Sequence, residues 1–390
     1  MTRATDFGGG LFLGTAVAVT LATLSAQTPR AEAIKANAKA IEQECQRAAG
    51  GDWQAWVNQL APFRKGMLAQ IEQALKNPRT SSQRTVSYGV LQAKGVPPLF
   101  DVTQSVGYLS PPELADYRTW LKERTSIPAI VAVKNWLKNR GIDLIFVPVP
   151  KMIEVYPERV AENVPPSRIV APHVRKMILD LLSQDVEVID LLPAFLEARR
   201  EDSAPLYLPA DPHWSDRGQR IAAGEIVRRL RRYLFAKQTL AKPSLYVTEE
   251  KTAFFRGAAW DLLTEAEHEA IGDAVNTPVQ IVKKKTNGES FVPVDDCPIM
   301  IIGDSYTDYT RASFASGSGI AAQVSKGINQ PVTVLTVQGG NLQPIKELLR
   351  DQDLLSQTQA IVWIVENVGF TNSWPALPVL PPVHRVANAH

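Results

Sequence analysis

The stretch PIMIIGDSY, residues 298–306, decides how this 390-residue sequence is interpreted. Its apolar residues Ile299–Ile302 predict a short strand that is buried on both faces, as in a parallel sheet. Gly303, Asp304 and Ser305 follow at once, and a helix is expected after them. Ligands of open parallel sheets bind at the carboxyl ends of the strands. The sequence therefore predicts that Ser305 lies on a strand-to-helix turn at the functional edge of a sheet.

Four further β-branched runs have the same character and alternate with helical segments. They are Leu144–Val149, Val186–Asp190, Val332–Val337 and Ile361–Val365. Runs that are apolar on both faces and separated by helices indicate a parallel sheet with helices on both sides. We therefore predict an α/β fold, a doubly wound and mainly five-stranded parallel sheet with an N-terminal helical extension.

Composition and periodicity divide the chain into four regions. The first contains an uncharged apolar run, Leu11–Ala26, which ends in the small-residue pattern Leu24-Ser25-Ala26 of an exported protein. The longer stretch Phe7–Ala26 could also just span a bilayer as an uncleaved anchor. The expected regions are a signal peptide or membrane anchor (residues 1–33), a helical extension and linker (34–107), the α/β domain (108–375) with an insertion at about 239–296, and a loose tail (376–390).

Apolar residues at helical spacing predict helices over Ile34–Ala49, Asp52–Lys76 and Pro128–Arg140. A further helix is expected from Ser110 to about Arg124, because Ser110-Pro111-Pro112-Glu113 has the form of a capping box with proline at the first helical position. The first two of these helices would form the extension ahead of the sheet.

The charge balance excludes one class of function. Lysine and arginine number 42 and aspartate and glutamate 40, so the formal net charge is 42 − 40 = +2. This removes the usual electrostatic argument for a nucleic-acid partner. The five histidines are scattered, and CxxC, HExxH and EF-hand patterns are absent from the sequence, so we expect neither a metal nor a cofactor. Cys45 and Cys297 are the two cysteines, and their spacing does not decide whether they pair.

A second polar motif, Asp211-Pro212-His213-Trp214-Ser215, precedes a helix expected from Gln219 to about Phe235. Asp211 and His213 lie two residues apart on a proline-containing turn, so the carboxylate can hold the imidazole in one tautomer. A serine hydroxyl becomes a nucleophile only when a neighbouring base accepts its proton. Ser305, His213 and Asp211 would therefore form a catalytic triad, although helix capping alone explains either motif taken singly.

Together, the two motifs resemble the alginate O-acetyltransferase group of the SGNH-hydrolase superfamily. The resemblance rests on Asp-x-His-Trp-Ser at 211–215, on Gly-Asp-Ser at 303–305, and on Val147–Lys151 with Tyr156-Pro157-Glu158. It covers about residues 110–372. In most SGNH hydrolases the serine comes before the Asp/His pair. Here it follows, as in the acetyltransferase group, where the motif order is circularly permuted.

The resemblance implies an SGNH-type serine O-acetyltransferase. The Gly-x-Ser-x-Gly elbow of α/β-hydrolases is missing, because Thr307 stands where the second glycine would be. An oxyanion hole would combine backbone and side-chain N–H donors at neighbouring strand ends. The implied site residues are the triad Ser305, His213 and Asp211; the oxyanion donors Ser305, Gly340 and Asn367, with Asn341 as a competitor for the last; and the candidate substrate contacts Tyr309, Arg311 and Trp214.

The resemblance also implies partners and a location. The acceptor would be a polysaccharide, and a membrane-embedded acyltransferase would deliver the acetyl groups. The protein would act in the periplasm or elsewhere outside the cytoplasmic membrane, either free or anchored to the inner membrane by its N-terminal segment. Two other functions stay open. They are a carbohydrate esterase that removes acetyl groups, and a catalytically silent glycan-binding subunit that works without Ser305.

Overall fold

The core of the molecule is a five-stranded sheet in which all neighbouring strands are parallel, in the order β4-β3-β9-β7-β8. The strands are β3 Asp143–Val149, β4 Glu187–Val188, β7 Ile299–Gly303, β8 Thr333–Thr336 and β9 Ala360–Glu366. The computed structural model describes residues 11–75, 79–80, 87–88, 125–159, 161, 163–201, 205–209, 211–257, 260–271, 276–308, 315–337, 341–372, 374–377 and 380. The predicted α/β fold with a five-stranded parallel sheet is confirmed, and each strand overlaps the run predicted for it.

The strand order has a simple relation to the doubly wound folds. If the strands are counted from β7, as β7, β8, β9, β3 and β4, the sheet has the order 2-1-3-4-5, which is one of the common doubly wound orders. The chain enters this cycle at β3 instead, so it is permuted in the way that the motif order indicates. In such sheets the ligand crevice lies where the strand order reverses, which here is between β7 and β9.

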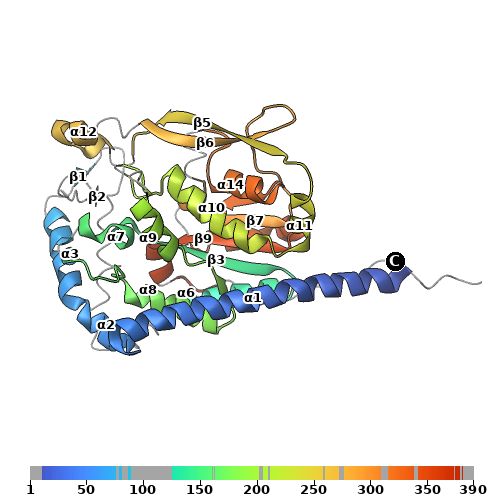
Figure 1. Cartoon of the computed structure of the whole chain (residues 1–390), viewed down its shortest axis with the longest axis horizontal. Helices are drawn as coiled ribbons and strands as arrows, with labels where there is room; N and C mark the ends of the chain where they lie inside the picture. Colours follow the sequence, from blue (N-terminus) through green and yellow to red (C-terminus); the bar gives the residue numbers. More distant parts are fainter. Residues whose placement is uncertain are drawn as a thin grey trace, which may run out of the picture.

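Helices cover both faces of the sheet (Figure 1). On one face lie α10 Asp216–Leu230 and α14 Ile320–Ile328, which pack against each other. On the other lie α6 Ser126–Lys138 and α8 Pro172–Ser183, with α1 outside them. Other elements include α7 Met152–Val155, α9 Leu192–Glu201, α11 Leu234–Leu240, α12 Glu265–Ile271, α15 Gln343–Arg350 and α16 Asn367–Thr371.

The N-terminal extension consists of α1 Leu11–Ala49, α2 Trp53–Gln59 and α3 Ala61–Leu75. The prediction of one helix over Asp52–Lys76 was wrong, because the chain breaks at Leu60 between α2 and α3. Pro62 explains the break, because it has no backbone N–H to continue the hydrogen bonds of α2, whereas proline fits the first turn of a new helix. Among the residues whose side chains the structure describes, which in α1 begin at Pro29, every helix is too short or too polar to cross a membrane.

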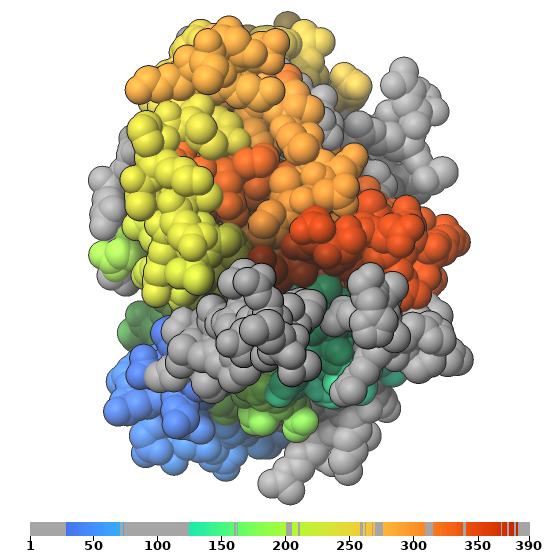
Figure 2. All heavy atoms as spheres, turned by 90° about the vertical axis from the view of Figure 1, so that its right-hand side faces the viewer, coloured from blue at the N-terminus to red at the C-terminus, as the bar shows by residue number. Residues whose placement is uncertain are grey.

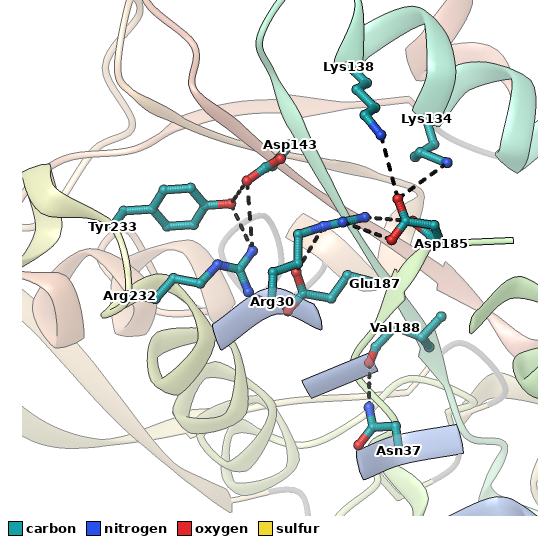
Figure 3. Close-up of polar contacts among 10 residues, drawn as sticks. All are labelled: Arg30, Asn37, Lys134, Lys138, Asp143, Asp185, Glu187, Val188, Arg232 and Tyr233. Atoms are coloured by element: carbon teal, nitrogen blue, oxygen red, sulfur yellow. Dashed lines mark hydrogen bonds and ion pairs between the residues drawn. The ribbon is translucent and has the colours of Figure 1, made fainter. Parts of the chain in front are cut away.

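Two buried charges, Arg30 and Glu187, and the half-exposed Asp185 hold α1 against the amino edge of the sheet (Figure 3). The guanidinium of Arg30 donates to the Asp185 carboxylate at 2.9 Å and lies 3.9 Å from the Glu187 carboxylate. The side-chain amide of Asn37 donates to the carbonyl of Val188 at 2.8 Å. Val188 belongs to the edge strand β4, whose outer backbone groups need partners. Helix α1 therefore compensates the negative charges of Asp185 and Glu187 and supplies a hydrogen-bond donor to the edge strand β4.

The same edge carries a second buried contact (Figure 3). The hydroxyl of Tyr233 donates to the Asp143 carboxylate at 2.6 Å. Arg232 connects this pair to Glu187, because its guanidinium binds the Glu187 carboxylate and also donates to the Tyr233 hydroxyl. Burial is the main cause that raises the pKa of Tyr233 above its usual value. Tyr233 is thus a neutral, buried hydroxyl at the end of the sheet opposite to the carboxyl ends.

The predicted insertion forms a separate antiparallel hairpin, β5 Tyr246–Phe254 with β6 Asn276–Lys284. Strand β6 packs on α10 and α14. Figure 2, which faces the right-hand side of Figure 1, shows these yellow and orange segments above the blue residues of α1.

The start and the end of the sheet domain meet. The hydroxyl of Thr125 donates to the carbonyl of Trp374 at 2.7 Å and accepts from the Trp374 backbone N–H at 2.6 Å. The helix predicted over residues 110–124 lies outside the described residues, as does most of the predicted tail, so the domain boundaries stay predictions. Cys45 and Cys297 are buried and unpaired.

Glu44 of α1 provides a test of how the extension is held. Its carboxylate accepts two hydrogen bonds, at 2.8 and 3.0 Å, from the guanidinium of the buried Arg175, which also lies 2.7 Å from Asp190. Glu44→Gln leaves the buried guanidinium undercompensated and is expected to lower the free energy of unfolding by about 2 kcal/mol. Urea denaturation followed by tryptophan fluorescence measures the change. Glu42→Gln, at an exposed position of the same helix, should change it by less than about 0.5 kcal/mol, and equal effects would contradict the prediction.

Candidate active site

His213 is carried by a short hairpin outside the main sheet. Tyr207 and Trp214 pair as an antiparallel bridge, the N–H of Leu208 donates to the carbonyl of His213 at 2.9 Å, and the N–H of Ser215 donates to the carbonyl of Leu206 at 2.8 Å. Pro209 and Pro212 lie in the segment that connects the two sides of this hairpin. Because these bonds fix the backbone on both sides of His213, its imidazole has one direction in which to point.

The residues after His213 lock this hairpin onto helix α10. Trp214 is fully buried, and Ser215 is the N-cap of α10, where its hydroxyl accepts from the N–H of Gly218 at 3.2 Å. A Cβ atom at Gly218 would lie 2.5 Å from the carbonyl oxygen of Leu206, so only glycine fits there. The Trp-Ser-x-x-Gly pattern is thus the set of contacts that joins the hairpin to the helix.

Ser305 follows β7 directly and opens the helical turn 305–308. The side chain of Asp304, not that of Ser305, caps this turn by accepting from the N–H of Tyr306 at 2.9 Å. A Cβ atom at Gly303 would clash with the hydroxyl of Thr307 and with the carbonyl of Ile364 on the neighbouring β9. The glycine therefore lets the chain turn sharply against β9, and the hydroxyl of Ser305 is left unused by the cap.

The two motifs meet at the carboxyl edge of the sheet. The Oδ1 atom of the fully buried Asp211 accepts from the His213 backbone N–H at 2.9 Å and lies 2.6 Å from its Nδ1. Since a carboxylate only accepts, this contact assigns a proton to Nδ1 and leaves Nε2 as an acceptor. Nε2 lies 2.9 Å from Oγ of Ser305. The arrangement can move a proton from Ser305 to His213 while Asp211 holds the ring.

A cluster of buried polar groups lies at the ends of β3 and β9. The Lys151 ammonium lies 3.3 Å from the Glu366 carboxylate. The Glu154 carboxylate accepts from the backbone N–H of Lys151 at 2.7 Å and from the side-chain amide of Asn367 at 2.8 Å. Glu366 is the last residue of β9 and Asn367 follows it, whereas Lys151 and Glu154 lie between the end of β3 and the end of α7. The cluster therefore ties the carboxyl ends of the two strands together beside the triad.

The structure places some of the other site residues that the sequence predicts, and the rest lie outside the described residues. The expectation that Trp214 contacts substrate was wrong, because its ring is fully buried and its indole N–H donates to the Tyr306 carbonyl at 2.9 Å. The amide of Asn341 donates to the carbonyl of Gly369 at 3.1 Å, and that of Asn367 donates to Glu154. These contacts do not decide between the two asparagines as oxyanion donors. Gly340, Tyr309 and Arg311 lie outside the described residues.

Sequence reasoning missed Asp304, Tyr306, Lys151 and Glu366. Asp304 and Tyr306 lie one and three residues after the end of β7, Lys151 lies two residues after the end of β3, and Glu366 is the last residue of β9. The usable signal was their position, because polar residues that directly follow buried strands lie at the functional edge. Their mutual contacts join three separate strands, and no local pattern in the sequence reports these pairings.

Asp304 lies beside both Ser305 and Glu366. Its burial, together with the charge of Glu366, raises the pKa of Asp304 to about 6, although the backbone N–H groups of Tyr306 and Glu366 donate to it. Ionising Asp304 is therefore less favourable in the folded state than in the unfolded chain, and the folded protein keeps this proton up to about pH 6.

This raised pKa predicts a pH-dependent stability. Above about pH 4, Asp304 is ionised in the unfolded chain, but in the folded chain it keeps its proton until about pH 6. The folded state therefore loses about 3 kcal/mol of stability as the pH rises through this window. Relative to Asp304→Asn, the wild type should lose this amount between pH 4 and pH 7 in urea denaturation. A constant difference between the two proteins would show that Asp304 titrates normally.

Comparisons with known proteins place the chain in a family. The family model described as an SGNH hydrolase-like domain, acetyltransferase AlgX, matches residues 115–366. A probable alginate O-acetylase AlgJ of Pseudomonas fluorescens is 24% identical over 245 residues, which cover 60% of this chain and 58% of that protein. The protein of the same name from Pseudomonas syringae pv. tomato is 24% identical over 254 residues, with 62% and 61% covered. The chain thus spans about three fifths of the length of these relatives.

Solved structures with similar folds include three proteins. The O-acetyltransferase domain of Pseudomonas putida AlgJ has a TM-score of 0.49 at 20% identity, over 68% of this chain and 88% of that one. Pseudomonas aeruginosa AlgX has a TM-score of 0.45 at 14% identity, over 63% and 58%. Bacillus cereus PatB1 has a TM-score of 0.43 at 12% identity, over 73% and 98%. Because the family model covers more than half of the chain and both motifs, this protein belongs to the family of SGNH hydrolase-like domains of the acetyltransferase AlgX type.

Proposed function

We propose that this protein is an exported O-acetyltransferase that moves an acetyl group through Ser305 onto a hydroxyl of a polysaccharide. The observation that carries the proposal is the hydrogen-bonded set of Asp211, His213 and Ser305 in a chain of the acetyltransferase AlgX family. The names of the relatives, probable alginate O-acetylases, support both the acetyl group and a polysaccharide acceptor.

In the first step, Nε2 of His213 accepts the Ser305 proton while Oγ attacks the carbonyl carbon of the acetyl donor. The tetrahedral intermediate then collapses, the bond to the leaving oxygen of the donor breaks, and His213 returns its proton to that oxygen. Ser305 is left as an acetyl ester. Asp211 stabilises the imidazolium that exists between the two proton transfers.

In the second step, the acceptor takes the place of the leaving group. A sugar hydroxyl gives its proton to Nε2 of His213 and attacks the acetyl-Ser305 carbonyl. The ester bond to Ser305 breaks, and the serine oxygen recovers the proton from His213. Transfer exceeds hydrolysis when the bound sugar keeps water from the acetyl group.

The negative oxygen of both intermediates needs N–H donors. Ser305 supplies its own backbone N–H, because the first residue of a helical turn has no partner for this group within the helix. We assign the other donors to Gly340 and to Asn367 or Asn341, as the sequence indicates.

The proposal includes a location and a donor. We propose that the N-terminal segment ahead of Arg30, with its apolar run Leu11–Ala26, directs the protein out of the cytoplasm as a signal peptide or an anchor, and that the protein works in the periplasm or on the outer side of the inner membrane. The acetyl group would come from a membrane-embedded acyltransferase. The apolar run Leu11–Ala26 and the naming of the relatives support this assignment.

The triad is tested with a chromogenic acetyl ester as donor and oligosaccharides as acceptors. Ser305→Ala and His213→Ala are each expected to lower kcat by about 10³-fold or more, because neither variant can form or resolve the acetyl-enzyme. Release of the chromophore measures the first step, and mass spectrometry of the sugars measures acetyl transfer. Ser183→Ala, which removes an exposed hydroxyl at the end of α8, should retain wild-type activity.

The products separate the remaining functions. Acetylated oligosaccharide made by the wild type, and lost in both variants, establishes the transferase. Free acetate in the presence of abundant acceptor, without acetylated sugar, would instead identify an esterase. Full activity of Ser305→Ala in cells would contradict any catalytic role for the triad and would indicate a binding subunit.

A further inference from the structure

Tyr306, the residue after Ser305, contacts the loop that carries His213. Its backbone carbonyl accepts from the indole N–H of Trp214 at 2.9 Å, and its hydroxyl donates to the carbonyl of Pro212 at 2.8 Å. Its ring lies against the His213 imidazole, with the ring centres 4.7 Å apart and the planes at 41°. One buried side chain therefore touches the residues immediately before and after His213 as well as the imidazole itself.

The hydroxyl of Tyr306 also contacts the Glu366 carboxylate at the end of β9. It lies 3.1 Å from Oε1 of Glu366, the same oxygen that lies 3.3 Å from the Lys151 ammonium. Glu366 is the last residue of β9 and Lys151 follows β3, so the tyrosine hydroxyl is fixed to the central strands of the sheet. Lys151, Glu366 and Tyr306 are all buried. Fixed charges of this kind hold a hydroxyl in one place more firmly than water does.

The contacts of Tyr306 connect the hairpin that carries His213 to the turn that carries Ser305. Ser305 is covalently attached to Tyr306, and His213 lies on a hairpin that is outside the sheet, so the hairpin needs a contact to stay in register with Ser305. The bonds to Pro212 and Trp214 supply this contact on both sides of the imidazole. A proton moves efficiently between Ser305 and His213 only when the Oγ to Nε2 distance stays near its 2.9 Å.

We propose that Tyr306 is a positioning residue of the triad, and that Glu366 positions Tyr306. The inference rests on the proposed acyl transfer through Ser305. The hydroxyl of Tyr306 fixes the His213 hairpin against the Ser305 turn, and the ring limits rotation of the imidazole. Glu366, held by Lys151, is a second acceptor within reach of the single hydroxyl proton, so the hydroxyl lies between Pro212 and β9 and loses both acceptors if it moves away. None of these three side chains takes part in the chemistry itself.

Tyr306→Phe tests the proposal, because it keeps the ring and removes the hydroxyl. With a chromogenic acetyl ester, kcat is expected to fall about three- to tenfold while KM changes less than twofold, since about one neutral hydrogen bond of positioning is lost. Glu366→Gln should lower kcat in the same direction, because an amide attracts the Lys151 ammonium less strongly than a carboxylate does.

Tyr233→Phe is the matched control. It also removes one buried tyrosine hydroxyl that binds a carboxylate, Asp143, but at the amino edge of the sheet (Figure 3). It should lower the melting temperature by an amount similar to Tyr306→Phe and leave kcat unchanged. If the two variants lose the same fraction of kcat, Tyr306 has a structural role only, and the proposal is wrong.

A second readout works without turnover. In the wild type, the Nδ1 proton of His213 is held by Asp211, and its exchange with water is measured by proton NMR on protein with labelled histidine. Tyr306→Phe should speed this exchange several-fold, and Tyr233→Phe should not. An unchanged exchange rate in a folded Tyr306→Phe protein would overturn the positioning role, whatever the activity.

The proposal and the proposed function fail in different ways. If Ser305→Ala is inactive and Tyr306→Phe has the wild-type kcat, the triad stands and the positioning role is refuted. If Ser305→Ala turns over as fast as the wild type, the acyl-transfer function is refuted, and the exchange rate of the Nδ1 proton then decides the role of Tyr306 alone. If Tyr306→Phe does not fold, Glu366→Gln gives the same test through kcat and proton exchange.

Discussion

The pairing of β9 with both of its neighbours is the constraint on which the rest of the sheet depends. This last strand of the chain lies between β3 and β7, and all seven of its residues are buried. It pairs with β3 from Asp143↔Ala360 to Val149↔Glu366, and with β7 from Ile299↔Ala360 to Gly303↔Ile364. Because β9 separates the strand that leads to Lys151 from the strand that leads to Ser305, these two parts of the site have a fixed spacing only when β9 is in place.

The site combines Ser305, which the central sheet fixes, with His213, which lies on a hairpin outside that sheet. Ser305 follows a central strand, so the sheet fixes it directly. His213 comes from a two-stranded hairpin next to α10, and its place depends on the cap at Ser215, the close contact at Gly218 and the packing of Trp214. Natural active sites often divide in this way, since a scaffold supplies precision and loops supply the reactive groups. Here the aromatic residue Tyr306, next to Ser305, contacts the hairpin at Pro212, His213 and Trp214.

Much of this could be read from the sequence, and the reasons are physical. The five strands were predicted because each contains a short β-branched run, and all of them except the edge strand β8 are fully or almost fully buried, as parallel strands covered by helices are. The order of the strands, the partner of Asn367 and the burial of Trp214 were not predicted, because they depend on contacts between residues more than ninety positions apart or between separate elements. Pro62 was the local signal for the break between α2 and α3, and it was outweighed by the apolar periodicity around it.

The contact between Thr125 and Trp374 bears on how the fold can be connected. Through one hydroxyl, it brings the first and the last described parts of the sheet domain together. When two described residues near the two ends of a domain lie this close, a short connection between them would let the chain be opened elsewhere without moving any strand. The permuted order of this chain and the order 2-1-3-4-5 counted from β7 therefore describe the same set of contacts. Connectivity in this architecture is thus free to vary during evolution while the geometry of the site stays the same.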